Sequence, residues 1–201
     1  MKMKLASCLI AALAFSNAHA ASVQNTTGIV SPATTITFDE VVLADSSLVT
    51  TEYSGLGVTF SSLYYNSQGP ATLPGISGNY VGNNVSGPLL NPFSIFFSSD
   101  VTSAAFGVAT NPGLSTFEAW NGGLFVESFS ASTSFDGSTD YYFGFTGITF
   151  DEIRVSVGGD GQMLIDNLQV TAVPEPETYA MLLAGLGLLG FMARRRKESA
   201  V

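Results

Sequence analysis

Short runs of alternating apolar and polar residues dominate the chain between residues 35 and 172. In residues 153–157, three aliphatic side chains alternate with Arg154 and Ser156, so an extended strand there has one buried and one wet face. Segments rich in Gly, Asn, Asp and Pro, such as residues 111–113 and 121–123, separate the runs. The pattern predicts an all-β domain over residues 35–172, built as an antiparallel, jelly-roll-like β-sandwich.

Phenylalanines at strand positions are expected to fill the core of this sandwich. The residues predicted to do so are Phe106, Phe117, Phe129, Phe143 and Phe150. In the final strand, residues 162–172, the apolar positions change phase near Asp166. A change of phase within one strand predicts either a β-bulge at that point or a strand centre that is covered on both faces.

The first 20 residues read as a secretory signal peptide. Lys2 and Lys4 precede an apolar run over residues 5–15, and small residues near residue 20 supply a cleavage site before Ala21. The Sec export machinery and signal peptidase are therefore expected partners. Residues 21–34 are rich in Ser, Thr and Asn and are predicted to form a spacer.

A second apolar segment lies near the C-terminus, over residues 179–193. A helix through this segment spans about 22 Å, which is short against a hydrocarbon core of about 30 Å. Four cations at residues 194–197 follow it, and long cationic side chains that reach the interface extend such a span. The pattern predicts one transmembrane helix with its cations in the cytoplasm, in preference to a buried core helix.

Residues 173–201 combine a Pro-Glu-Pro element, a Leu/Gly-rich apolar helix and an arginine cluster. In this order the three parts resemble the PEP-CTERM protein-sorting signal, a tail also described as the C-terminal domain of an ice-binding protein. The resemblance implies an exosortase as partner, in a Gram-negative bacterium that produces exopolysaccharide. It also implies a transient inner-membrane anchor, followed by a place on the cell envelope surface or in the extracellular matrix. The sorting residues would be Pro174, Glu175, Pro176, Arg194, Arg195 and Arg196.

The body also resembles the exported domains that commonly precede this tail. The resemblance rests on a Thr-Phe-Asp-Glu run at residues 37–40 and an Ile-Asp-Asn-Leu run at residues 165–168. It implies a secreted, carbohydrate-binding-like sandwich and assigns no binding residue.

The composition of residues 21–173, the predicted exported body, excludes several kinds of catalytic and metal-binding site. Cys8 and His19 are the only cysteine and histidine, and both lie in the predicted signal peptide. Without them the body has no Ser-His-Asp or Cys-His machinery and no histidine-ligated zinc site. Arg154 is the only cation between residues 21 and 173, against 13 carboxylates. This balance excludes nucleic acid as a partner.

Carboxylate and amide oxygens are the ligands that calcium prefers. The first and last strands of a sandwich often lie close together, which would bring Asp39 or Glu40 near Asp166 and Asn167. We therefore expect no cofactor other than a structural Ca²⁺ at these four residues.

Aromatic side chains are the candidates for a binding surface, because flat rings stack on sugar faces. Trp120 directly precedes a turn at residues 121–123, where a hairpin tip would expose it; the alternative is that Trp120 packs beneath its own turn. Tyr64 and Tyr65 are the other candidate glycan contacts.

The sequence favours an exported, exosortase-sorted, non-catalytic surface or extracellular-matrix protein that binds exopolysaccharide in a biofilm. Two alternatives stay open. One is a carbohydrate-active enzyme that uses a pair of carboxylates. The other is a calcium-dependent structural or adhesive surface protein.

Overall fold

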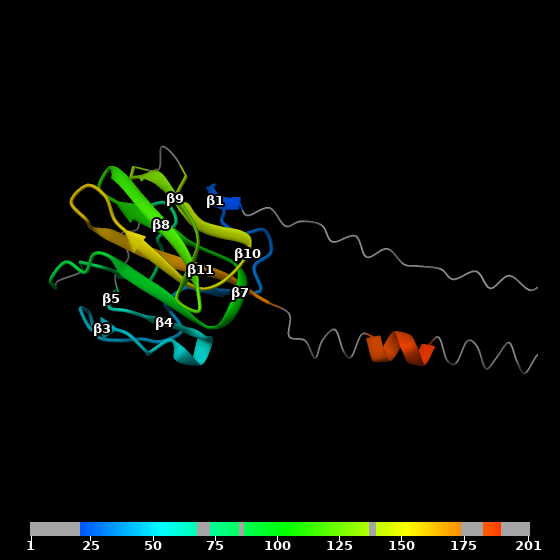
Figure 1. Cartoon of the computed structure of the whole chain (residues 1–201). Coiled ribbons are helices and arrows are strands. Elements are labelled where there is room, and N and C mark those ends of the chain that lie inside the picture. Colours follow the sequence, from blue (N-terminus) through cyan, green and yellow to red (C-terminus); the bar gives the residue numbers. More distant parts are fainter. Residues whose placement is uncertain (1–20, 68–72, 85–86, 137–139, 174–182, 190–201) are drawn as a thin grey trace, which may run out of the picture.

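The computed structural model describes residues 21–67, 73–84, 87–136, 140–173 and 183–189 (Figure 1). The predicted signal peptide and all six sorting residues lie outside these ranges. A short 3₁₀ helix, η1, spans Ser54–Leu56. The strands of the described residues are β1 (Ala21–Asn25), β2 (Thr34–Ile36), β3 (Leu48–Val49), β4 (Val58–Phe60), β5 (Leu63–Asn66), β6 (Tyr80–Gly82), β7 (Phe93–Thr110), β8 (Gly113–Asn121), β9 (Leu124–Thr133), β10 (Tyr142–Ser156) and β11 (Met163–Ala172).

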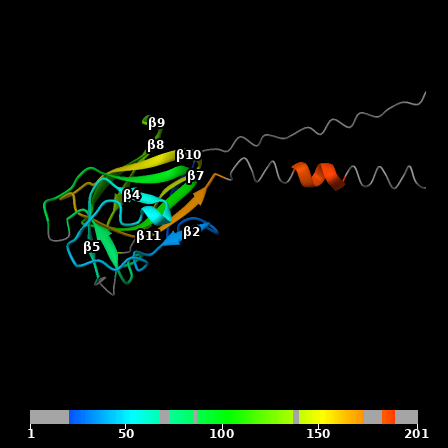
Figure 2. The same ribbon diagram turned by 90° about the horizontal axis from the view of Figure 1, so that it is seen from below.

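All described strand pairs are antiparallel, which confirms the all-β prediction. Hydrogen bonds connect the strands into one network with the order β3-β5-β6-β11-β7-β10-β8-β9, while β1 joins β10, β2 joins β11 and β4 joins β7. Figures 1 and 2 both show β8 and β9 on one flank and β5 on the other, with β7 and β10 between them.

The sheet folds over on itself, as the ring contacts of Phe117 demonstrate. Phe117 in β8 pairs with Val155 in β10, yet its ring stacks on Phe143, which lies 12 positions earlier in β10, with 5.3 Å between ring centroids. A straight strand would place Phe143 about 40 Å from Val155, at about 3.3 Å per residue. Strand β10 therefore bends and contributes its two halves to two facing layers.

Irregularities in the pairing of β10 with β7 locate the bend. The register shifts between Thr146 and Phe150 and again between Phe150 and Glu152. Such bulges let one strand pass from one packed layer to the next. Because β7 pairs with β10 on both sides of the shifts, β7 also belongs to both layers.

The space between the layers is filled mainly by phenylalanine rings, as the alternating pattern predicts. The ring of Phe117 stacks on Phe129 as well as on Phe143, with centroids 5.0 Å apart in the Phe129 pair. Phe106 and Phe150 are also fully buried, so all five predicted phenylalanines belong to the core or pack against it.

The predicted spacer at residues 21–34 is in part wrong. Strand β1 begins at Ala21 and pairs with the first half of β10, and Val23 points into the domain and is buried. The polar composition that suggested a spacer also suits a strand of an antiparallel sheet that has one face open to solvent. Residues 21–25 therefore belong to the β domain.

The predicted transmembrane helix lies mostly outside the described residues. Its described part, residues 183–189, is helical, and the side chains there are exposed. Within the described ranges, no helix combines the length and the apolar character needed to cross a membrane.

Candidate functional site

One row of side chains crosses the outer face of the layer that contains β8 and β9. Strand pairing aligns Glu152 of β10 with Phe96 of β7 on one side and with Trp120 of β8 on the other. The row continues to Thr59 of β4 and to Phe125 of β9. Positions next to these along the strands, including Ile153 and Ala119, point inward and are fully buried. Alternation therefore puts three aromatic residues on the outside of a five-strand surface.

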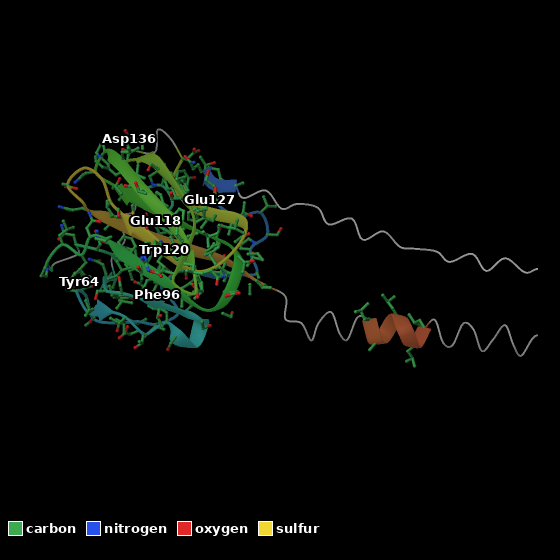
Figure 3. The ribbon with its side chains drawn as sticks, viewed as in Figure 1. Tyr64, Phe96, Glu118, Trp120, Glu127 and Asp136 are labelled. Carbon is green, nitrogen blue, oxygen red and sulfur yellow. The ribbon has the colours of Figure 1, made fainter. Side chains whose placement is uncertain are left out.

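A second row lies directly beside the first and supplies charge. Arg154 of β10 is opposite Ser94 of β7 and Glu118 of β8. The Arg154 guanidinium lies over the Trp120 ring, 3.9 Å from its centroid, in a cation–π contact. The Trp120 indole N–H donates to Glu118 Oε2 at 3.1 Å. Figure 3 shows Glu118, Trp120 and Phe96 close together on this part of the domain.

Glu152 fixes the position of Arg154. Arg154 Nε donates to Glu152 Oε1 at 2.6 Å, and Nη2 donates to Oε2 at 3.1 Å. The Ser94 hydroxyl also donates to Glu152 Oε1, at 2.8 Å. Hydrogen bonding to this carboxylate raises the pKa of Arg154. The two hydrogen bonds to Glu152 thus hold the guanidinium over the indole ring. We call Phe96, Glu118, Trp120, Phe125, Glu152 and Arg154 the aromatic platform.

The sequence left open whether Trp120 is exposed at a hairpin tip or packs beneath its own turn, and the structure shows an intermediate arrangement. Its ring is partly buried and meets Phe125 edge to face, with centroids 5.6 Å apart across the hairpin. Phe125 is 54% exposed, and Phe96 is also exposed. Sequence reasoning found Trp120 but missed its neighbours. Alternation alone places Arg154 outward, but only the pairing of strands distant in sequence places it beside Trp120.

The two tyrosines proposed with Trp120 lie elsewhere. Tyr65 in β5 is fully buried in the core, and burial raises the pKa of its hydroxyl. Tyr65 cannot contact a glycan, so that prediction is wrong. Alternation explains the error, because Leu63 and Tyr65 share the inward face of β5 while Tyr64 points outward. Tyr64 is half-buried and lies on the flank away from Trp120 (Figure 3).

The predicted calcium residues come together in part. Strand β2 pairs with β11, so the first and last parts of the domain are adjacent. Asp39 accepts the backbone N–H of Asn79 at 3.1 Å, and Asp166 accepts that of Ser77 at 2.7 Å. Both carboxylates thus contact the same loop, residues 73–79. Glu40 instead accepts hydrogen bonds from Thr37.

Asp166 is a fully buried carboxyl group. It lies where the register of β11 against β7 shifts, which confirms the predicted bulge. Burial is the main cause that raises its pKa to about 7; hydrogen bonds from Ser77 and Asn167 act in the opposite direction, and the nearby charge of Asp39 adds to the rise. Asn167 has φ +51° and donates through its side chain to Gly75 O and to Asp166 Oδ2.

This arrangement gives a cation few free oxygens. The Asp166 carboxylate already accepts three amide N–H groups, and the Asn167 amide presents its NH₂ group there. Among the residues that the structure describes, no group of three or more Asp, Glu, His or Cys side chains is arranged to hold a metal ion. Calcium binding at Asp39, Glu40, Asp166 and Asn167 stays a prediction.

Comparison with known families gives a match in the tail. The family model of the PEP-CTERM protein-sorting motif matches residues 172–197. The chain carries a PEP-CTERM sorting motif. This confirms the resemblance of the Pro-Glu-Pro element, the apolar segment and the arginine cluster. No curated protein matches the chain.

The PEP-CTERM motif identifies an exported, envelope-associated protein that exosortase sorts. Because the match begins at the last residue of β11, it assigns a route to the protein and no activity to the β domain. Any activity of the domain has to be argued from its own surface.

Proposed function

We propose that this PEP-CTERM protein is a non-catalytic component of the cell surface or extracellular matrix. Its jelly-roll-like β domain binds the exopolysaccharide of the biofilm through the aromatic platform. The observation that carries this proposal is the outward row of Phe96, Trp120 and Phe125, with Arg154 fixed over the indole.

The chemistry of the platform suits a sugar chain. Aromatic faces pack against the C–H faces of sugar rings, and carboxylates and hydroxyls beside them bond sugar hydroxyls. Phe96 and Trp120 are two strands apart, which is about 10 Å. The row therefore presents spaced apolar surfaces, with the charged groups of Glu118 and Arg154 beside them. An extended polysaccharide can lie across several strands of such a surface.

Charge favours a neutral polysaccharide over an acidic one. Residues 21–173 contain one cation and 13 carboxylates, so their formal charge is 1 − 13 = −12. The single cation, Arg154, is already paired with Glu152. A polymer of acidic sugars would meet repulsion from the domain with no free cation in it to offset the charge.

The hydrogen bonds that Glu152 accepts support a binding role for the platform over hydrolysis. A glycosidase pair needs one carboxyl group as acid and one free carboxylate as nucleophile or base. Both oxygens of Glu152 accept hydrogen bonds from Arg154, and Oε1 also accepts one from Ser94. This carboxylate is held as a structural ion pair, which disfavours the alternative of a carboxylate-pair enzyme built on Glu118 and Glu152.

Glycan binding is tested by electrophoresis of the purified protein through gels that contain the exopolysaccharide of its host. Trp120→Ala is expected to weaken retardation by about tenfold in apparent affinity, equal to about 1.4 kcal/mol. The control is Phe135→Ala, an exposed aromatic residue outside the platform, which should behave like the wild type. Equal retardation of wild type and Trp120→Ala, with unchanged urea unfolding, would refute a role for the platform.

We further propose that Sec export and signal peptidase produce a chain that begins at Ala21, and that the tail anchors it in the inner membrane until exosortase acts. Intact-mass measurement of the native protein tests this sequence of events. With exosortase present, we expect a product that ends near residues 174–177. A product that still ends at Val201 in the same cells would mean that the anchor is permanent.

A further inference from the structure

The two ends of the β domain lie side by side. Ala21 is opposite Thr146 in β10, Thr146 is opposite Ser103 in β7, and Ser103 is opposite Thr171 in β11. Three strand spacings of about 4.8 Å separate the first and last positions of this row. Figure 1 shows β1 and the end of β11 at the same end of the domain. We call this end of the domain, which contains Ala21 and Thr171, the exit end.

Only a short linker joins the exit end to the apolar tail segment. Residues 174–178 separate Val173 from the apolar run over residues 179–193. Even a fully extended chain of this length reaches only about 20 Å, at about 3.3–3.6 Å per residue. If the apolar run lies in a bilayer, the exit end must lie at or near the head groups.

Exposed aliphatic side chains surround the point where the chain leaves. Val30 is 91% exposed and lines a shallow hollow with Ser103, Thr146 and Thr171. Leu56 is also exposed and shares a second hollow with Val101 and Ala172. Both therefore lie next to the row that joins the two ends of the domain.

The turn between β8 and β9 brings a third exposed aliphatic residue to this end. The Gly122 N–H donates to Asp151, which follows Phe150 in β10. Phe150 is opposite Val101, and Val101 is opposite Ala172 at the end of β11. Leu124, directly after the turn, is 74% exposed. Exposed apolar residues gathered at one place on a soluble domain indicate a contact surface.

The charged groups at the exit end indicate which kind of lipid surface it can contact. The backbone N–H of Val173 donates to the carbonyl of Asp100, and Asp151 lies beside the turn, so two carboxylates and no cation of the β domain are found here. Anionic lipid would be repelled, because attraction to anionic head groups requires Lys or Arg. A zwitterionic phospholipid surface accepts apolar side chains without this penalty.

We propose that the exit end rests on the outer surface of the inner membrane, with Val30, Leu56 and Leu124 in contact with zwitterionic phospholipid. The inference rests on the proposed anchoring by the tail. Contact of this kind holds the β domain in one orientation while exosortase acts at residues 174–176. The opposite end of the domain then points away from the membrane.

Leu124 and Leu114 form a matched pair for a test. Leu114 is 64% exposed and lies near the other end of β8, opposite Ser132 in β9. Its distance from the turn is about 20–25 Å, at about 3.4 Å per residue. Both residues are exposed leucines of one hairpin, so replacement by a labelled cysteine should disturb the fold equally little.

The experiment uses the exported chain with its tail intact, isolated from cells that lack exosortase; a chain that begins at Ala21 contains no native cysteine. Leu124→Cys and Leu114→Cys each receive an environment-sensitive fluorophore. The proteins are incorporated into phosphatidylcholine vesicles that contain a nitroxide-labelled lipid. We expect nitroxide quenching at position 124 to exceed that at position 114 by at least about twofold, with a blue shift of emission only at position 124.

Flotation of the vesicles separates the two possible failures. Protein that floats with the vesicles but shows equal or no quenching at the two positions would overturn the membrane contact and leave the anchor standing. Protein that fails to float would overturn the proposed anchor and, because the membrane contact rests on that anchor, the membrane contact as well. Glycan retention by the platform is measured separately and is unaffected by either result.

Discussion

The two outer faces of the β domain differ in what covers them. The face that carries Trp120 and Arg154 is open to solvent and presents aromatic and charged groups together. The opposite layer is covered near β11 by the segment that contains Ile76 and Tyr80, which pack with Ala109 in a second small apolar cluster. Both faces consist of alternate residues on strands that share one phenylalanine core.

The two layers differ in how the charge of a buried carboxyl group is compensated. Glu152 on the open face is paired with Arg154, and its charge is compensated locally. Asp166 beneath the loop at residues 73–79 has no cation beside it among the described residues, and burial raises its pKa. The open face is therefore suited to binding, while the covered face couples the fold to pH.

The largest expected effect comes from the core that both faces share. Phe117→Ala removes a fully buried ring that stacks on both Phe129 and Phe143. The expected loss is about 3–5 kcal/mol in the free energy of unfolding, because a cavity is left between the layers. Urea unfolding followed by tryptophan fluorescence measures it.

Phe125→Ala is the matched control for Phe117→Ala, because it removes an exposed ring from the neighbouring strand. Its expected loss is below about 1 kcal/mol. Similar losses for the two variants would contradict the assignment of Phe117 to the interior and Phe125 to the platform.

A smaller and pH-dependent effect is expected from the covered face. The pKa of Asp166 is raised from 3.8 to about 7 in the folded protein. The folded state therefore binds this proton more tightly than the unfolded state. The contribution to stability is fully present below about pH 4 and is lost as the pH rises to about 7, by an amount on the order of 2–4 kcal/mol.

Asp166→Asn removes this titration and is expected to flatten the fall in unfolding free energy between pH 4 and pH 7. Urea midpoints measured across that range give the slope. Asp100→Asn, at an exposed carboxylate, should keep the slope of the wild type. A wild-type stability that rises steadily from pH 4 to pH 7, unchanged by Asp166→Asn, would show that Asp166 is ionised at low pH in the folded protein.

Local alternation was enough to predict the β class and the side on which many residues lie. The inward set in residues 153–157 and the bulge near Asp166 are both present in the structure. The same rule, applied to residues 63–65, would have excluded Tyr65 as a glycan contact, because it shares a face with buried Leu63.

Register between strands distant in the chain could not be predicted from alternation. Phe96 meets Glu152, and Glu152 meets Trp120, only because β10 lies between β7 and β8. A shift of two residues in the β7–β10 pairing would keep every side chain on its face and still separate Phe96 from Glu152 and Trp120. The aromatic platform is therefore a property of the tertiary pairing.

The pairing of the earliest strands with the latest ones also sets when the protein acquires its shape. Ala21 finds its partner only when Thr146 is present, and Ile36 finds its partner only when Leu168 is present. Such distant contacts form late, because the intervening chain must first be brought together. In the proposed export route, a polypeptide that emerges from the secretion channel starting at Ala21 is expected to stay unfolded until nearly the whole domain has crossed. Because the sorting tail follows immediately in the sequence, folding would coincide in time with the proposed anchoring.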